Sequence, residues 1–316
     1  MLIMNTQFEK IILVTRQTRL EELIARFNTK AQARFYIEHS GGNFALYERE
    51  HEVYETAVSH LRRQLQQVAR FQLIERQFLP NFLFSQSDLV VTIGIDGLVV
   101  NTAKYLDGQP LIAVNPDPKH IDGVLLPFTV KQAPAVVEQA LRGQMTIRPI
   151  SMAEARLNDG QSLLAFNDLF IGRHDHISAR YRLRFQARQE THSSSGIIVS
   201  TGAGSTGWLS SLFNMANGMV STFAGQDQPL SQPTLPWEAD KLLFVVREPF
   251  VSQTSAAGIV CGAITADTPL HLESTMPDGG VIFSDGIMAD FLNFNAGATA
   301  TIKLAERKTN LVVGGG

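Results

Sequence analysis

The feature that most constrains the fold of this chain is a run of β-branched and aliphatic residues that ends directly in a glycine turn. Ser87 to Ile93 (SDLVVTI) is followed at once by Gly94-Ile95-Asp96-Gly97. A continuous apolar run of this length is typical of a strand covered on both faces, as in a parallel sheet. The run therefore predicts an α/β layer structure rather than a one-sided antiparallel sheet.

The surrounding sequence supplies the other elements of such a domain. Short apolar runs at Lys10 to Thr15 and Pro110 to Asn115 predict further buried strands. Apolar residues recur at helical spacing in Leu20 to Glu38, Glu50 to Arg70 and Val130 to Leu141. Strands that alternate with helices predict a Rossmann-like α/β domain with a parallel sheet, which we expect to occupy residues 1–142.

The pattern changes after Gln144, where short alternating runs are separated by turn residues. In Ala179 to Ala187 (ARYRLRFQA) three arginines alternate with Tyr181, Leu183 and Phe185, which predicts a strand with one exposed face. We expect residues 143–295 to form a β-rich, sandwich-like domain. A length of 316 residues suits two domains, each large enough to bury a core.

Composition excludes several classes of protein. There are 27 Lys and Arg against 30 Asp and Glu, so the near-neutral charge argues against a nucleic-acid or membrane-surface partner. Cys261 is the only cysteine, which excludes a disulfide scaffold, and its apolar surroundings predict a core position. The sequence offers no long uncharged apolar window and no signal-peptide core at its start, so we expect a cytoplasmic protein.

The Gly94 to Gly97 turn is the first candidate site. A glycine turn at the end of a parallel strand lets bare backbone N–H groups approach a phosphate and places the Asp96 carboxylate at the carboxyl end of the sheet. Open α/β sheets bind their ligands at that edge. The alternative is an ordinary turn, since Asp-Gly is a common turn pair.

Ser200 to Gly207 (STGAGSTG) is the second candidate, between a predicted strand and a predicted helix. Its hydroxyls and the amides of a helix N-terminus would suit an anion. Residues 202–207 match the dinucleotide pattern G-x-G-x-x-G, but no strand ending in an acidic residue follows at the required distance. A serine-rich helix cap remains the structural alternative. Neither loop is a Walker A loop, because no Gly-Lys-Ser/Thr follows.

Taken together, these loops resemble the NAD kinases. That family carries Gly-Gly-Asp-Gly after a strand, an Asn-Glu pair in mid-chain, and a later glycine- and serine-rich loop. The equivalents here are Gly94 to Gly97, Asn167-Asp168 in AFNDLFIG, and Ser200 to Trp208. PLIAVNPDP (residues 110–118) and VIFSDG (residues 281–286) extend the resemblance over nearly the whole chain, and NPDPKHIDGVLLPF and REPFVSQTS are similar to a divergent branch that includes the mitochondrial type.

The resemblance implies a two-domain enzyme with its active site between the domains and a last strand, near residues 296–316, that returns to the first domain. It implies transfer of a phosphoryl group from ATP, with Mg²⁺, to the 2′-hydroxyl of the adenosine ribose of NAD, by a homodimer or homotetramer. Asp96 would be the catalytic carboxylate. Phosphate or nucleotide would be bound by Gly94, Gly97, Asn115, Ser200 and Thr201. NAD would be bound by Asn167, Asp168, Ser195, Ser205, Thr206, Gly207, Trp208 and Ser211.

Several residues depart from the family pattern. Ile95 replaces a glycine and adds a side chain where phosphate-binding amides should be bare. Leu98 replaces a threonine, and Ser195 stands where the family usually has an aspartate. Asp168 is one methylene shorter than the family glutamate, and Trp208 replaces a tyrosine but can still stack on a base. Asp96 and Gly97 are kept, so the phosphoryl-transfer site is predicted to persist while the choice of substrate stays open.

Three hypotheses follow. The first is an ATP-dependent kinase that makes NADP from NAD. The second is a kinase of the same fold acting on a sugar or lipid hydroxyl, because lipid kinases of this superfamily share the Gly-Gly-Asp-Gly loop. The third is a non-catalytic nucleotide-binding or sensing protein, in which Ile95 closes the phosphate cradle.

Overall fold

The computed structural model describes residues 8–224 and 229–314, which form two compact units. Unit 1 extends to Arg148 and resumes at Thr309, and unit 2 is Pro149–Lys308. None of the helices within the described ranges is both long enough and apolar enough to cross a bilayer. The predicted combination of an α/β domain with a β-rich domain is confirmed.

Unit 1 is built on a mixed sheet with the strand order β2-β1-β3-β4-β19-β6, in which β1, β2, β3, β4 and β19 pair in parallel and β5 also pairs in parallel with β4. Its strands are β1 (Lys10–Thr15), β2 (Arg70–Glu75), β3 (Asp88–Ile93), β4 (Pro110–Asn115), β5 (Phe128–Thr129), β6 (Thr146–Ile150) and β19 (Thr309–Val313). Its helices are α1 (Arg19–Phe27), α2 (Lys30–His39), α3 (Phe44–Val68), α4 (Asp96–Ala103) and α5 (Ala133–Leu141), with a short 3₁₀ helix η1 (Arg76–Asn81).

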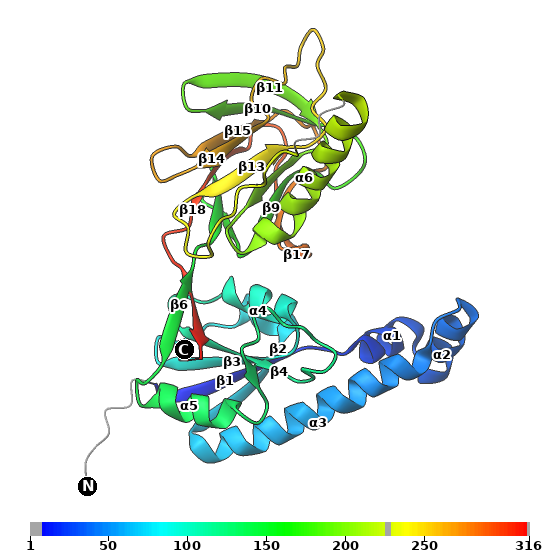
Figure 1. Ribbon diagram of the computed structural model, residues 1–316, viewed down its shortest axis with the longest axis vertical. Coiled ribbons are helices and arrows are strands. Elements are labelled where there is room, and N and C mark those ends of the chain that lie inside the picture. The colour runs from blue at the N-terminus through cyan, green and yellow to red at the C-terminus, as the bar shows by residue number, and fades with distance from the viewer. Residues whose placement is uncertain (1–7, 225–228, 315–316) are drawn as a thin grey trace. The chain divides into compact units, whose positions relative to one another are not determined.

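The two central strands of this sheet are covered on both faces, as their sequences predict. Every residue of β3 and of β4 is buried. Side chains of β1, β3 and β4 that point to one face pack with apolar residues of α3 and α5, and α4 lies on the opposite face (Figure 1). A strand between two helical layers has no water-facing side, so both sets of alternating residues are apolar.

The helical segment after β1 differs from the prediction. The stretch Leu20 to Glu38 forms two helices rather than one, because Asn28 adopts a left-handed conformation (φ 65°) and Thr29 caps α2 through the N–H of Gln32. Asn tolerates the left-handed region and Thr is a favoured N-cap, so the break lies where both occur together. Helices α1 and α2 share a small core around Leu20 and Phe44.

Unit 2 consists of two six-stranded antiparallel sheets that share one core, so it is a β-sandwich. The sheet orders are β11-β10-β15-β18-β7-β8 and β14-β13-β12-β9-β16-β17. The strands are β7 (Ala153–Leu157), β8 (Ser162–Ala165), β9 (Asp168–Arg173), β10 (Ala179–Phe185), β11 (Arg188–Ser194), β12 (Ile197–Ser200), β13 (Leu242–Val246), β14 (Cys261–Ile264), β15 (Leu270–Ser274), β16 (Gly280–Ser284), β17 (Ile287–Asn293) and β18 (Thr299–Leu304).

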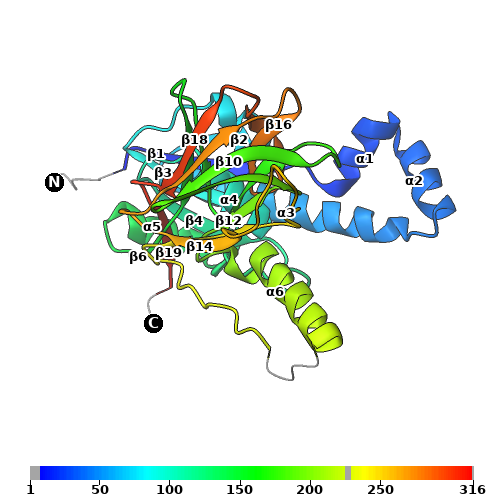
Figure 2. The same cartoon turned by 90° about the horizontal axis from the view of Figure 1, so that it is seen from above.

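Helix α6 (Trp208–Met219) packs outside the sandwich (Figures 1 and 2). Its residues Trp208 and Leu212 contact Phe170, Ile198 and Val281 on the outer face of the second sheet. The 3₁₀ turn η2 (Gly204–Thr206) precedes α6 and the π-helical turn η3 (Val220–Ala224) follows it. This packing fixes the loop between β12 and α6, which carries the second candidate site.

Of two predictions made from local sequence in unit 2, the structure confirms one and contradicts the other. Strand β10 alternates as expected, with Tyr181, Leu183 and Phe185 buried and the arginines between them exposed. Cys261, in contrast, is exposed rather than part of the core. It begins β14, the edge strand of its sheet, where an apolar sequence context does not ensure burial.

Candidate functional site

The turn that follows β3 lies at the carboxyl end of the unit 1 sheet, and α4 begins within it at Asp96. A Cβ at Gly94 would approach the Leu98 Cδ2 to 3.0 Å, so crowding accounts for this glycine. Gly97 is exposed, and a Cβ there would meet only Ile95, at 4.0 Å. Packing therefore explains Gly94 but gives no reason for glycine at position 97.

The Asp96 carboxylate is partly buried and bonded to a neighbouring loop. Its Oδ2 accepts the backbone N–H of Val124 at 3.1 Å and its Oδ1 accepts that of Leu125 at 3.0 Å. Asn115 braces the start of the same loop, because its Nδ2 donates to the carbonyl of Ile121 and its Oδ1 accepts the N–H of Asp117. Both side chains thus hold the loop after β4 against the N-terminus of α4.

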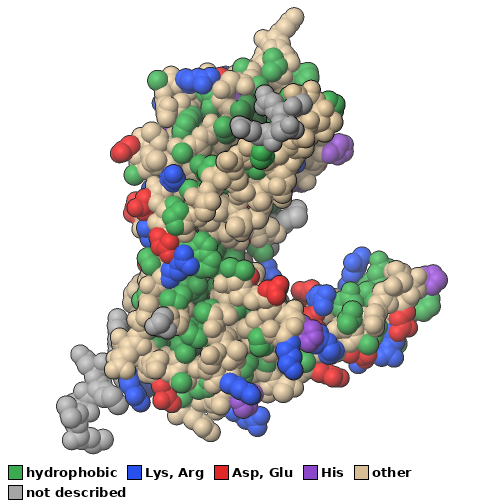
Figure 3. Space-filling view, viewed as in Figure 1, with side chains coloured by type: hydrophobic (Ala, Val, Ile, Leu, Met, Phe, Trp, Pro, Cys, Tyr) green, Lys and Arg blue, Asp and Glu red, His purple; other side chains and the backbone are tan. Residues whose placement is uncertain are grey.

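A cavity of about 340 Å³ in unit 1 adjoins this turn. Ile95 lines it with a side chain that is 42% exposed, so this residue points into the cavity and not into the core. Charged side chains gather over α1–α3 in this unit (Figure 3). Those that line the cavity are Arg16, Arg19, Arg49, Glu50, Asp117 and His120.

Arg16 is the most buried cation of this cavity. Its guanidinium donates to Glu50 Oε1 at 2.9 Å and lies 5.0 Å from the centre of the Tyr54 ring, while its Nε is buried with no hydrogen-bond partner within residues 8–224 and 229–314. Burial works to raise the pKa of Glu50, but the hydrogen bonds from Arg16 and Arg19 hold it below its ordinary value. This carboxylate therefore stays charged at neutral pH.

On the opposite wall, Asp117 contacts Arg49 and His120. Burial again works to raise the pKa of Asp117, and the hydrogen bond from His120 with the charges of His120 and Arg49 holds it below the ordinary value. These cavity residues were missed by the sequence reasoning. A usable signal existed for Arg16, which follows directly after the apolar run of β1 and so lies at the same carboxyl edge of the sheet as Asp96.

In unit 2, the Asn167-Asp168 pair is held in place by Asp285. The Asp285 carboxylate accepts the backbone N–H groups of Phe166, Asn167 and Asp168 at 3.0, 2.7 and 3.2 Å. Asp285 and Gly286 have φ angles of 54° and 70° and connect β16 to β17, so the carboxylate stands at the tip of a two-residue hairpin turn. Asp285 thereby fixes the backbone on which both predicted NAD-binding side chains are mounted.

The Asp168 side chain lies in an unusual environment for a carboxyl group. Burial raises its pKa to about 7, the hydrogen bond with Ser200 opposes this rise, and the charge of Asp285 adds to it. Its Oδ1 is buried without a hydrogen-bond partner in the part of the chain that the structure describes. Because buried polar atoms are nearly always hydrogen-bonded, this oxygen is suited to receive a ligand.

The Ser200 to Gly207 loop packs tightly against this pair. A Cβ at Gly204 would come within 2.3 Å of the Asn167 carbonyl, and one at Gly202 within 2.0 Å of the Pro236 carbonyl. Thr201 donates its N–H to the Asn167 carbonyl (2.9 Å) and its hydroxyl to that of Phe166 (2.6 Å). The glycines of this loop are thus required by the close approach of two backbones.

The hydroxyl groups of the loop divide into two sets. Those of Ser200, Thr201 and Ser205 are buried and donate to backbone carbonyls, so they hold the loop together rather than face solvent. The hydroxyl-bearing residues Thr206, in the loop, and Ser211, in α6, are exposed, as is Gly207 between them. Of the predicted set, the structure brings Asn167, Asp168, Ser200 and Thr201 into direct contact through strand pairing and hydrogen bonds, while Ser205 bonds within its own loop to Gly202.

Ser195 and Trp208 line a separate cavity of unit 2, of about 590 Å³. The Trp208 ring stacks on Phe170, with centroids 5.9 Å apart and planes inclined by 9°. The guanidinium of Arg247 lies 5.5 Å from the Trp208 ring centre, and Ser195 donates its hydroxyl to Glu248. Arg247 and Glu248 were not among the predicted site residues, although both belong to the stretch REPFVSQTS that the sequence resemblance includes.

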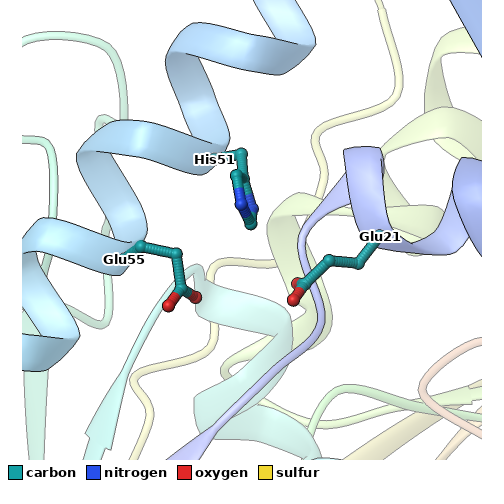
Figure 4. Close-up of side chains that lie close together, drawn as sticks. All are labelled: Glu21, His51 and Glu55. Carbon is teal, nitrogen blue, oxygen red and sulfur yellow. The ribbon is translucent and has the colours of Figure 1, made fainter. Parts of the chain in front are cut away.

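A cluster of possible metal ligands lies at the junction of α1 and α3. Glu21, His51 and Glu55 have ligand atoms within 4.8 Å of one another (Figure 4). Glu21, however, accepts the N–H and hydroxyl of Thr18 as part of the α1 capping box, and Thr18 Oγ1 lies 3.0 Å from His51 Nδ1. These hydrogen bonds join α1 to α3. They explain the positions of Glu21 and His51, two of the three side chains, without a metal ion.

Comparisons with known proteins were made for the whole chain. No family model matches it. NAD kinases of Heliobacterium modesticaldum and Caldanaerobacter subterraneus subsp. tengcongensis are 33% and 29% identical over 132 and 137 residues, or 39% and 40% of this chain. The matched region spans 45–47% of those relatives, so it covers about half their length.

Solved structures extend the likeness to the fold as a whole. An NAD kinase from Archaeoglobus fulgidus in complex with ATP aligns over 96% of this chain and 92% of its own, with a TM-score of 0.54 and 14% identity. Yeast NADH kinase complexed with NADH aligns over 98% and 87%, with a TM-score of 0.57 and 13% identity. The chain is therefore related to the NAD kinases in sequence over part of its length, and it shares their two-domain fold over nearly all of it.

Proposed function

We propose that this protein is an ATP-dependent kinase that transfers a phosphoryl group to the 2′-hydroxyl of the adenosine ribose of NAD or NADH. The observation that carries the proposal is Asp96, a carboxylate at the carboxyl edge of a parallel sheet and the start of α4, in a chain related to NAD kinases. That edge is where open α/β sheets bind ligands. The solved relatives are described with ATP and with NADH.

Phosphoryl transfer requires positioning and neutralisation of charge more than covalent chemistry by the protein. In the proposed reaction Asp96 orients the acceptor hydroxyl and accepts its proton as the oxygen attacks the γ-phosphorus, while the bond from that phosphorus to the β,γ-bridging oxygen breaks and ADP leaves with its electron pair. The exposed backbone at Gly97 leaves room for phosphate oxygens near the N-terminus of α4. Arg16 and Arg49 supply positive charge in the adjoining cavity of the same unit.

Asn167 and Asp168 are proposed to bind the acceptor dinucleotide. Support comes from the buried Asp168 Oδ1 without a partner among the described residues, and from the bonds of Asp285 that fix the backbone beneath it. A carboxyl group of raised pKa at this position can accept a hydrogen bond when charged and donate one when protonated. A ribose hydroxyl or the nicotinamide amide can meet either form.

The Mg²⁺ that accompanies ATP would find an oxygen ligand in Asp96. Each Asp96 oxygen accepts one backbone N–H, which leaves further lone pairs on the carboxylate. In nucleotide sites Mg²⁺ is commonly bound by one or two carboxylates together with phosphates. The ion would neutralise charge on the transferring phosphoryl group.

The test is formation of NADP from purified protein, NAD, ATP and Mg²⁺, with Asp96→Asn and Asp122→Asn assayed in parallel. Asp122 is an exposed carboxylate of the same unit and serves as the matched control. We expect Asp96→Asn to lose at least about 100-fold in rate, the low end for a positioned acid–base group, and Asp122→Asn to stay close to wild type. An Asp96→Asn enzyme within a few-fold of wild type would reduce Asp96 to a loop anchor.

Absence of NADP from the wild-type protein would contradict NAD as the acceptor. ATP turnover in the presence of a sugar or lipid alcohol would then indicate the second hypothesis. Binding of NAD without turnover at any Mg²⁺ concentration would indicate a sensing protein, the hypothesis favoured by the Ile95 side chain in the unit 1 cavity.

We further propose that the protein is cytoplasmic and forms a homodimer or homotetramer. Light scattering tests the oligomeric state.

A further inference from the structure

Helix α6 carries an apolar stripe that is covered along only part of its length. Trp208, Leu212, Met215 and Met219 recur at spacings of three or four residues, which places them on one side of the helix. Trp208 and Leu212 pack against the outer face of the second sheet of unit 2. Met215 and Met219, in the turns that follow, are 46% and 56% exposed. The stripe therefore runs past the sheet and stays open to solvent among the described residues.

The described chain that follows α6 leaves these methionines open. Asn217 is two residues from each of them and so lies on the opposite side of the helix, roughly 160° away. Its side chain accepts the N–H of Leu230 at 2.6 Å and donates to the Leu230 carbonyl at 3.2 Å, so the returning loop crosses α6 on that side. Phe223 of η3, which is 86% exposed, adds to the apolar surface. Figure 2 shows the C-terminal half of α6 beyond the strands of unit 2.

The sequence around this stripe contains no charge. No Asp, Glu, Lys or Arg occurs from Ser193 to Gln226, a range that includes the whole of α6. Helices that bind a lipid surface typically carry Lys and Arg on their polar face, so this composition does not favour a membrane. Two copies of one patch present the same charges to each other, and a patch without charges meets its copy with no repulsion. Because methionine side chains also adapt to the surface that they meet, the stripe is suited to pack against a second copy of itself.

We propose that the exposed half of α6 packs against the same half of α6 in a second copy of this chain, with the two helices antiparallel about a two-fold axis. The inference rests on the homodimer or homotetramer proposed above and assigns one of its interfaces. In such a contact Met215 of each copy lies beside the partner's Met219. Few side chains take part, so we expect association through this surface to be weak and to depend on protein concentration.

The experiment is light scattering of the purified full chain over a dilution series. The variant Met219→Glu places a charge in the stripe. Asn214→Glu is the matched control, because it adds the same charge at an exposed position on another side of α6. We expect Met219→Glu to raise the concentration needed for association by about 10-fold or more, since the interface would bury an unpaired charge. Asn214→Glu should associate as the wild-type protein does.

A second measurement needs no variant. In protein labelled with ¹³C at the methionine methyl groups, the NMR signals of Met215 and Met219 should shift on dilution, because dissociation exposes these methyl groups to water. The signal of Met152, which is 1% exposed, is the internal reference and should not move. The two glutamate variants should melt near the wild-type temperature at low concentration, since each replaces an exposed side chain.

The outcomes separate this interface from the oligomer and from the kinase. Wild-type association in Met219→Glu, equal weakening in Asn214→Glu, or methyl signals that stay constant while the mass changes would reject the α6 contact and leave the proposed oligomer in place. A wild-type protein that remains monomeric at every concentration would reject both, whether or not it forms NADP. Binding of the wild-type protein, but not of Met219→Glu, to phosphatidylcholine vesicles would assign the stripe to a lipid surface and overturn the proposal.

Discussion

Single carboxyl groups in this protein have roles that their environments determine. Asp285 lies in a left-handed conformation at a hairpin tip and accepts three backbone N–H groups, which makes it an anchor. Asp168 donates one of those N–H groups, and its own carboxyl group is buried with a raised pKa. Of these two aspartates in contact, Asp285 has a structural role through its three accepted hydrogen bonds, whereas Asp168 can change its protonation near neutral pH.

The raised pKa of Asp168, about 7, makes stability depend on pH. Between the ordinary aspartate value of 3.8 and about 7 the folded state retains a proton that the unfolded state loses, so the contribution of this group to stability falls as pH rises through that window. Asp168→Asn mimics the protonated form. We expect its free energy of unfolding, relative to wild type, to rise by about 1 kcal/mol or more from pH 5 to pH 8.

Urea unfolding of both proteins at several pH values measures this difference. Circular dichroism and tryptophan fluorescence should be followed together, because different transition midpoints for the two signals would reveal separate unfolding of the two units. A difference that stays constant from pH 5 to pH 8 would show that Asp168 titrates near its ordinary value.

At the scale of elements, the loop between β12 and α6 is fixed by close packing and by hydrogen bonds of its own hydroxyl groups. Because residues 202 and 204 are glycines, the loop backbone can contact the carbonyl groups of Pro236 and Asn167. The buried hydroxyls of Thr201 and Ser205 donate further hydrogen bonds to backbone carbonyls. The loop and the hairpin tip at Asp285 hold the same short segment from two directions. The Asn167-Asp168 pair is therefore held in place by hydrogen bonds from two separate elements.

Replacement of Gly204 by alanine tests this packing. The new Cβ would lie 2.3 Å from a backbone carbonyl, so we expect a loss of about 1–3 kcal/mol or more, together with weaker dinucleotide binding. Gly218→Ala is the control, because its Cβ would meet nothing within 4 Å in the exposed part of α6 and should add roughly 0.5–1 kcal/mol. Thermal melting of both variants compares them, and similar effects at the two positions would contradict the packing account.

At the scale of the whole molecule, the chain builds most of unit 1, forms all of unit 2, and then completes the sheet of unit 1 with β19. That strand lies between β4 and β6 in the sheet. Leu311 is 1% exposed and pairs with Leu111 of β4. The stability of unit 1 therefore depends on residues that follow unit 2 in the sequence.

Leu311→Ala should accordingly destabilise unit 1. Loss of a buried leucine costs about 2–5 kcal/mol, and we expect faster hydrogen exchange in peptides of β3 and β4. Peptides of β9 and β12 in unit 2 provide the internal reference and should exchange as in wild type. Equal loss of protection in both units would show that they unfold as one body.

The sequence by itself determined the elements whose burial is written in a local pattern. The uninterrupted apolar runs at β3 and β4 predicted strands covered on both faces, and the alternation in β10 predicted a strand with one exposed face. The Gly94 to Gly97 turn was placed correctly because it follows directly after such a run. In each case the burial of a residue follows from the pattern of its sequence neighbours, uniformly apolar in β3 and β4 and alternating in β10, so the local sequence is enough to predict it.

Only the tertiary structure decided what depends on residues far apart in the chain. Asp285 bonds to Phe166 across 119 positions, Arg49 meets Asp117 across 68, and the need for glycine at 202 and 204 arises from carbonyls of other loops. The direction of Ile95 and the shared cavity of Arg247 and Glu248 are likewise set by backbone geometry. Packing between separate elements creates these contacts. They do not recur at regular intervals along the sequence, so no local sequence pattern predicts them.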